Sequence, residues 1–193
     1  KKFFLKCFLF KLVHRFLYIG QENKSFYKMM GVKDNQLIFS PYSVDNERFI
    51  KNLSQVELSK NDIRKKYNIN NKSIIFLFVG KFIYKKRPMI LLKAIKVIEK
   101  EIRNKISLVY IGKGQKENDM RSFISVNELT NVEILGYKNQ LELAEIYKMA
   151  DIFILPSGIG ETWGLVINEA MNFNLPILAS DMVGSVKDLV RRE

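Results

Sequence analysis

Cysteine and histidine are almost absent from this sequence of 193 residues, which holds one of each, Cys7 and His14. A single cysteine cannot close an intramolecular disulfide or build a thiolate metal cluster, so the composition fits a reducing compartment and predicts a cytoplasmic protein. We interpret the lone histidine as structural or surface-exposed, because it lies in a basic segment and not in a glycine-rich loop.

The sequence also has no run of about 20 apolar residues, the length that a membrane-spanning helix needs. Residues 1–13 come nearest, but Lys6 and Lys11 interrupt them and no small-residue cleavage site of a secretory signal follows. At helical spacing their apolar positions cover most of the circumference, which predicts a largely buried helix with a basic edge. A helix on an anionic membrane surface is the alternative.

Acidic residues are scarce in the first half of the chain. Residues 1–100 hold 22 Lys and Arg against 7 Asp and Glu, whereas residues 101–193 hold 10 against 13, and the net charge of the whole is +12. A basic half could serve nucleic acid, an anionic membrane or a phosphorylated substrate. Because 47% of the residues are hydrophobic, the chain can fill a core and is not a disordered one.

Glycine and proline are few, 10 and 4, and several of them punctuate a regular alternation of segments. Before residue 52 the pattern predicts strands at 17–19 and 37–39 around a helix at 22–30. The polar stretch 52–73 has neither glycine nor proline, and we interpret it as linker-like with a brief helix near 63–67.

From residue 74 the alternation predicts a larger set of elements. The strands are expected at 74–79, 106–111, 132–135, 152–155 and 177–179. The helices are expected from about 88 to 98 and at 117–126, 141–149 and 165–171. Strands that alternate with helices predict an α/β fold with a parallel, doubly wound sheet, in which ligands bind beyond the carboxyl ends of the strands.

Two loops at predicted strand ends could bind a phosphate. Four basic residues come just before a helix whose first N–H groups also favour an anion, and they are Lys81, Lys85, Lys86 and Arg87. The segment Gly112-Lys113-Gly114 would allow close approach of the backbone to a ligand. A solvated basic surface and an ordinary turn are the alternatives.

A third loop leads into a helix with two carboxylates. Glu161 precedes that helix and Glu169 follows two turns later, while free N–H groups are expected at Trp163, Gly164 and Leu165. The carboxylates could accept hydrogen bonds from sugar hydroxyls while the N–H groups hold a phosphate. Alternatively, Glu161 caps the helix and Glu169 is solvated.

Several short motifs follow one another in a fixed order between residues 38 and 188. They are Val79-Gly80-Lys81, Lys86-Arg87-Pro88, Ile111-Gly112-Lys113-Gly114, Ile134-Leu135-Gly136, Ala150-Asp151-Ile152, the pair Glu161 and Glu169, and Leu175-Pro176-Ile177 with Ser180-Asp181. In this order they resemble the donor-binding half of a retaining, family-4 (group 1) glycosyltransferase. The resemblance implies the Rossmann-like C-terminal half of a GT-B fold with a remnant of the N-terminal domain.

The resemblance also implies roles for individual residues, with Glu161 and Lys86 as the catalytic ones. Lys81 and Lys86 would grip the donor diphosphate, although the family usually has Arg at position 81 and Lys lacks its planar fork. Glu161 would contact the transferred sugar and Glu169 the ribose. The further donor-binding positions implied are Gly80, Gly112, Gly136, Tyr137, Trp163, Gly164 and Leu165. No metal or other cofactor is expected, because no Asp-x-Asp arrangement is present.

The resemblance divides the chain into three parts. Residues 1–47 would be the tail end of the N-terminal acceptor-side domain, 48–72 a linker, and 73–193 a nucleotide-sugar-binding domain truncated at its C-terminus. The implied reaction moves a sugar, with retention, from a nucleotide-diphosphate sugar, expected to be a UDP-sugar, to a glycan or lipid-linked acceptor in surface polysaccharide biosynthesis. The enzyme would be cytoplasmic, with peripheral contact to the anionic inner face of the membrane.

Two other function classes remain open from the residues alone. Sugar-nucleotide epimerases and other GT-B-like enzymes share the fold, and fold alone does not separate their reactions. A basic nucleic-acid-binding module is the minor alternative. Because no zinc ligands, helix-turn-helix spacing or aromatic-rich recognition strand accompany the charge, we expect no nucleic acid partner.

Overall fold

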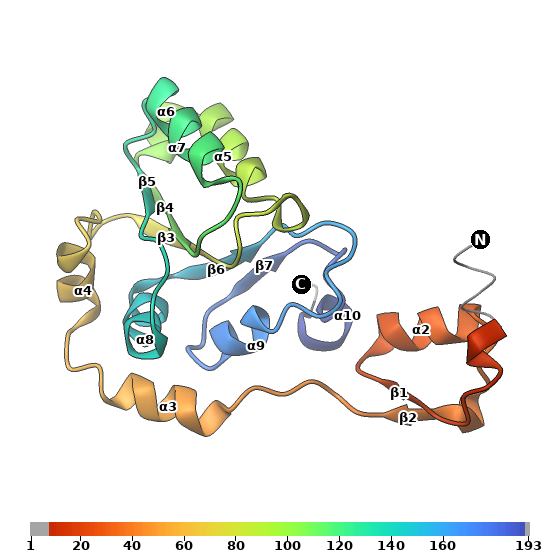
Figure 1. Ribbon diagram of the computed structural model, residues 1–193. Helices are drawn as coiled ribbons and strands as arrows, with labels where there is room; N and C mark the ends of the chain where they lie inside the picture. The colour runs from red at the N-terminus through yellow and green to blue at the C-terminus, as the bar shows by residue number, and fades with distance from the viewer. Residues whose placement is uncertain (1–7, 192–193) are drawn as a thin grey trace.

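The computed structural model describes residues 8–191, and its main body is a five-stranded parallel sheet (Figure 1). The strands lie in the order β5-β4-β3-β6-β7. Their bounds are β3 Ile74–Val79, β4 Ile106–Ile111, β5 Val132–Ile134, β6 Ile152–Leu155 and β7 Ile177–Ala179. The chain runs outward from β3 to β5 and then returns to place β6 beside β3, so the direction of winding reverses between these two strands.

Helices cover both faces of this sheet, as expected for a doubly wound fold. Figure 1 shows α5, α6 and α7 on one face and α8 and α9 on the other. The bounds are α5 Pro88–Val97, α6 Lys100–Arg103, α7 Glu117–Val126, α8 Gln140–Met149, α9 Val166–Met171 and α10 Val186–Leu189. Because both faces are covered, the central strands are buried apolar runs, and the buried Tyr110 of β4 donates its hydroxyl hydrogen bond to Pro88 O at 2.8 Å.

Two packed helices overlap the stretch 52–73 that we interpreted as linker-like, since α3 Asn46–Ser54 ends in it and α4 Lys60–Lys66 lies within it. Both pack against α8, and Phe49 and Ile63 are buried in the same core as the sheet. The brief helix predicted near 63–67 is thus present as α4, and the stretch 52–73 packs on the main body instead of forming a free linker. A few apolar residues at helical spacing are enough to attach a short charged helix, and most of the polar residues between them face solvent, with Asn52 and Arg64 as buried exceptions. The boundaries of the three domains stay predictions.

A buried arginine fixes α4 to the amino edge of the sheet. Arg64 donates from Nε and Nη2 to Met149 O and pairs with Asp151 Oδ2 at 2.7 Å. The same carboxylate oxygen accepts the Ile75 N–H at 2.7 Å, and Lys60 pairs with the other oxygen. Burial would raise the pKa of Asp151, but the Ile75 and Lys60 hydrogen bonds and the charges of Arg64 and Lys60 outweigh it and lower that pKa.

The N-terminal part is a small two-stranded parallel sheet. Strands β1 Phe16–Tyr18 and β2 Leu37–Phe39 flank α2 Gln21–Met29, within one residue of the predicted bounds. Residues 1–7 of the predicted terminal helix lie outside the described residues, and residues 8–10 are helical. The described part is not buried as expected, since Phe8 and Leu12 are 62% and 66% exposed. On the side of this segment that faces the small sheet, the Phe10 ring packs against the ring of Phe16, with centroids 5.0 Å apart.

This small sheet touches the main body through the start of α2. The Gln21 N–H donates to the Asp188 carboxylate at 3.0 Å, and Glu22 forms an ion pair with Lys187. Gly20 lies so close to the Trp163 ring that a Cβ there would overlap it. Within residues 8–191, no helix has the length and apolarity that a membrane crossing requires.

Candidate active site at the carboxyl edge of the sheet

The reversal of winding between β3 and β6 brings two of the predicted loops together. Lys86 ends the short 3-10 turn Tyr84–Lys86 after β3, and Glu161 lies in the loop after β6. Lys86 Nζ is 2.7 Å from Glu161 Oε2, and their side chains are only 14% and 8% exposed. The approach lacks hydrogen-bond geometry, and within residues 8–191 this buried carboxylate oxygen accepts no hydrogen bond, so the charge of the lysine is what stabilises it here.

Lys85 ties the same two loops through both its backbone and its side chain. Its carbonyl oxygen accepts the Gly158 N–H at 2.8 Å, and its Nζ donates to Gly160 O at 3.1 Å. The same Nζ lies 3.9 Å from Glu161 Oε2. Two cations thus flank one buried carboxylate, and the sequence had marked Lys85 only as one member of a basic loop.

The loops after β3, β4 and β5 stack closely on one another. The Gly80 N–H donates to Ile111 O at 2.9 Å, and the Gly112 N–H donates to Gly136 O at 2.8 Å. Gly112 has φ +135°, and a Cβ at this position would overlap the Gly80 carbonyl. Gly112 is therefore needed for the close approach of these two backbones.

These loops border a cavity of about 360 Å³. It is lined by Val79, Gly80, Lys81, Ile111, Gly112, Lys113, Tyr137, Lys138, Gln140 and Leu143. Four predicted donor-binding residues are among them, and a fifth, Gly136, precedes the exposed Tyr137. Apolar side chains with three lysines at one cleft suit a ligand with a flat apolar part and a negative charge. No sequence signal had marked Lys138 or Gln140.

Glu169 is partly buried on α9 and is not the solvated residue of the alternative interpretation. Its Oε2 accepts the hydroxyl hydrogen of the buried Tyr147 at 3.1 Å. Burial raises the pKa of Glu169, against the smaller lowering effects of Tyr147, Arg48 and Lys86. Tyr147 had carried no sequence signal, because its contact depends on how α8 packs against α9.

The segment before α9 presents backbone donors. Trp163 is buried, and its indole Nε1 donates to Asn168 Oδ1 at 2.9 Å. Gly164 has φ +83° and packs against Val183, where a Cβ would be 2.9 Å from Cγ1. Within residues 8–191, the N–H groups of Trp163, Gly164 and Leu165 have no acceptor, so they are available to a ligand. The helix itself begins at Val166, one residue later than predicted.

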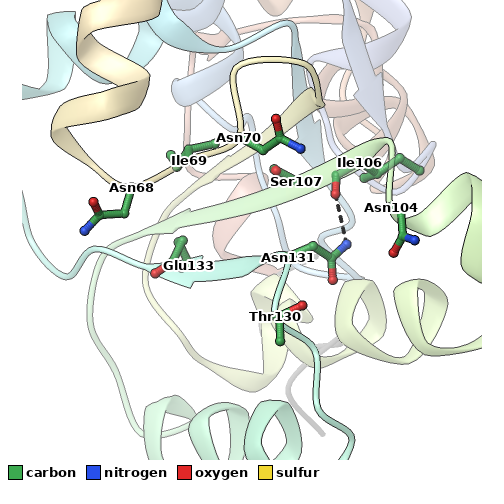
Figure 2. Close-up of a pocket in the computed structure, with 9 residues that line it drawn as sticks. All are labelled: Asn68, Ile69, Asn70, Asn104, Ile106, Ser107, Thr130, Asn131 and Glu133. Carbon is green, nitrogen blue, oxygen red and sulfur yellow. Dashed lines mark hydrogen bonds between the residues drawn. The ribbon is translucent and has the colours of Figure 1, made fainter.

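A second cavity, of about 330 Å³, lies at the opposite, amino edge of the sheet (Figure 2). Its lining is neutral apart from one carboxylate and consists of Asn68, Ile69, Asn70, Asn104, Ile106, Ser107, Thr130, Asn131 and Glu133. Burial raises the pKa of Glu133. Because this lining has no cation, the cavity does not suit a diphosphate, and the carboxyl edge is the better candidate site.

No metal cluster is evident in the part of the chain that the structure describes. Among residues 8–191, no three His, Cys, Asp or Glu side chains gather in a way that could hold a metal ion.

Comparison with known proteins gives one family. The model of the family described as "Glycosyl transferases group 1" matches residues 59–193. The chain is 27% identical over 186 residues to the UDP-Gal:alpha-D-GlcNAc-diphosphoundecaprenol alpha-1,3-galactosyltransferase of Escherichia coli, covering 94% of the chain and 46% of that protein. It is 25% identical over 180 residues to the N,N'-diacetylbacillosaminyl-diphospho-undecaprenol alpha-1,3-N-acetylgalactosaminyltransferase of Campylobacter jejuni, covering 92% and 45%.

Solved structures share the fold. WaaG, a glycosyltransferase involved in lipopolysaccharide biosynthesis, matches 89% of this chain and 45% of its own with a TM-score of 0.73 at 19% identity. Anabaena HepE in complex with UDP matches 93% and 48% with a TM-score of 0.75 at 16% identity. The predicted α/β fold of GT-B type, with its doubly wound parallel sheet, is thereby confirmed. The chain spans about half the length of the curated relatives it matches.

Proposed function

The chain belongs to the group 1 glycosyltransferases, and on this basis we propose that it is the donor-binding part of an enzyme that transfers a sugar from a nucleotide-diphosphate sugar. The observation that carries the proposal is the meeting of Lys86 with the buried Glu161, beside a cavity with further lysines. Cations suit the diphosphate, and a carboxylate that a neighbouring cation holds in place suits a sugar hydroxyl as hydrogen-bond acceptor.

Most of the predicted residues have a task in this proposal. Lys81 and Lys86 bind the diphosphate, with the free N–H groups that precede α9, and Glu161 binds the transferred sugar. The partly buried Glu169 accepts hydrogen bonds from the ribose, while Gly136 and Tyr137 border the base. When the glycosidic bond breaks, the leaving diphosphate gains negative charge, and fixed cations and N–H donors stabilise that charge without reorganising.

The finer assignments belong to the same proposal. We infer a family-4 enzyme that retains the anomeric configuration, uses a UDP-sugar and needs no metal, because lysines and backbone donors serve the diphosphate. The acceptor is proposed to be lipid-linked or a glycan in surface polysaccharide biosynthesis, since two relatives carry diphosphoundecaprenol-linked acceptors in their names. With such an acceptor, we propose that the enzyme works in the cytoplasm, in peripheral contact with the anionic inner face of the membrane.

Calorimetric titration with UDP-galactose, UDP-N-acetylglucosamine and GDP-mannose tests the site. Lys86→Ala and Glu169→Ala are each expected to weaken binding of the preferred donor about tenfold or more, since a hydrogen bond to a charged group contributes about 1.5–3 kcal/mol. Lys96→Ala, on the outer side of α5, is the matched control with unchanged affinity. Unchanged affinity in both site variants would refute the assignment.

The configuration of the product tests the reaction type. Once full-length protein and a sugar acceptor are combined, the anomeric configuration of the product is read by nuclear magnetic resonance. A product with inverted configuration would contradict the retaining mechanism but not the assignment of the donor-binding residues.

A further inference from the structure

Arg87 connects the turn after β3 to α5 in an unusual backbone conformation. Its φ of 51° and ψ of 41° lie in the left-handed region, which residues other than glycine, asparagine and aspartate rarely occupy. Strained backbone of this kind persists only where the surrounding structure holds it, and it is frequent at functional sites. The conformation thus directs attention to what the Arg87 side chain contacts.

The guanidinium of Arg87 lies directly against Gly158 in the loop after β6. A Cβ at position 158 would be 2.5 Å from Arg87 Nε and 2.8 Å from Nη2. Gly158 is not among the residues with positive φ, so its backbone conformation does not require glycine. Close approach of the arginine is what a side chain at position 158 would disturb.

The loop that Arg87 touches is the one that carries Glu161. The Glu161 N–H donates to Gly158 O at 3.3 Å and closes a turn, while the Gly158 N–H donates to Lys85 O. Lys85, Lys86 and Arg87 therefore each hold the segment 158–161, the first through backbone and Nζ, the second through the Glu161 carboxylate and the third through Gly158. Within residues 8–191, the Arg87 guanidinium forms no ion pair and donates no hydrogen bond.

We propose that Arg87 is a positioning residue, whose guanidinium packs on Gly158, fixes the turn 158–161 and so sets the place of the Glu161 carboxylate. The inference deepens the proposed function and rests on it for the contact between Glu161 and the sugar. Arg87 itself touches neither sugar nor diphosphate. Its loss therefore affects recognition of the sugar and leaves recognition of the nucleotide unchanged.

Hydrogen exchange tests the positioning without any ligand. In Arg87→Ala, the amides of Gly158 and Glu161 are expected to exchange about tenfold faster, because loops held by few contacts open at low free-energy cost. The amides of β3 and β6 should be unchanged. Arg121→Ala, an exposed arginine on α7, is the matched control. Unchanged exchange at 158–161 in Arg87→Ala, and in Arg87→Gly as a second variant, would overturn the proposal.

Binding of the diphosphate alone and of the whole donor separates positioning from direct contact. Arg87→Ala is expected to bind UDP within about twofold of the parent and UDP-galactose about tenfold more weakly, a difference of about 1.4 kcal/mol. Equal loss for both ligands would overturn the proposal, since it would make Arg87 a phosphate ligand. If the parent chain binds neither UDP nor UDP-galactose, the proposed function fails, while hydrogen exchange still decides the role of Arg87.

The contact itself is tested by a double-mutant cycle. Gly158→Ala should displace the guanidinium and speed exchange at Glu161 as Arg87→Ala does. Because the two changes remove one shared contact, the double variant is expected to be no worse than the more affected single variant. Additive effects would show that Arg87 and Gly158 act separately and would overturn the proposal.

Discussion

Gly112 is a residue at which backbone packing leaves no room for a side chain. Gly112→Ala is expected to lower the free energy of unfolding by about 1–3 kcal/mol, since the added Cβ overlaps the Gly80 carbonyl and the stacked loops must separate. Chemical denaturation measures the change. Gly31→Ala is the matched control, because Gly31 also has positive φ but nothing within 4 Å of its Cβ position. Equal losses in both variants would contradict close packing at Gly112.

Glu169 is a residue whose ionisation opposes folding. Burial raises its pKa in the folded state, so the folded protein binds the proton more tightly and its stability falls as the pH rises from the unfolded to the folded pKa. Glu169→Gln removes this dependence and keeps an acceptor for the Tyr147 hydroxyl. Thermal denaturation between about pH 4 and 8 should therefore show equal or higher stability of the variant at neutral pH.

The same variant separates stability from binding. If Glu169 serves the ribose, Glu169→Gln should bind the donor about tenfold more weakly while it melts no earlier than the parent. A variant that melts earlier at neutral pH would contradict the sign of the pKa shift. One that binds UDP-sugars normally would contradict the ribose contact.

At the scale of elements, α4 depends on Arg64 for its attachment to the sheet. Arg64→Ala is expected to cost about 3–5 kcal/mol of unfolding free energy, because several buried hydrogen bonds and the pair with Asp151 are lost together. Lys65→Ala, one residue along and exposed, should change stability by no more than about 0.5 kcal/mol. Urea denaturation compares the two, and similar losses would refute the anchoring role.

The ionisation of Asp151 affects the stability of the parent protein in the opposite direction to that of Glu169. Its pKa is lowered on folding, so its contribution to stability is complete above the unfolded pKa and is lost as the pH falls through the folded pKa. In Arg64→Ala this acid-dependent loss should be smaller, since the charge of Arg64 contributes to the lowering. If the stability of Arg64→Ala falls toward low pH as steeply as that of the parent protein, this assignment is contradicted.

At the scale of the whole molecule, the small sheet and the main body meet at Asp188. Asp188→Ala removes the acceptor of the Gln21 N–H and is expected to speed exchange of that amide, while β3 and β4 stay protected. Hydrogen exchange read by nuclear magnetic resonance measures the change. Asp181→Ala, an exposed residue in the loop after β7, is the control. Unchanged exchange at Gln21 would mean that other contacts hold the two parts together.

The sequence alone determined most of the elements. The bounds of β3, β4, β6 and β7 agree with the apolar runs that predicted them. For the central strands β3 and β4 the reason is that a strand covered on both faces is mostly apolar. The sequence also predicted the basic loop 81–87 and the loop that carries Glu161 as candidate ligand sites. Helix α3 was not predicted, and only a brief helix near 63–67 was predicted for α4, since short charged helices gain their stability from tertiary packing and not from their own residues.

Only the tertiary structure decided which loops meet. Periodicity identifies strands but not their lateral order, and it is the return of the chain to place β6 beside β3 that brings Glu161 within 2.7 Å of Lys86. The contact of Arg87 with Gly158 and that of Tyr147 with Glu169 follow from the same order. Their partners are distant in sequence, and a distance between side chains is fixed only when both backbones are packed.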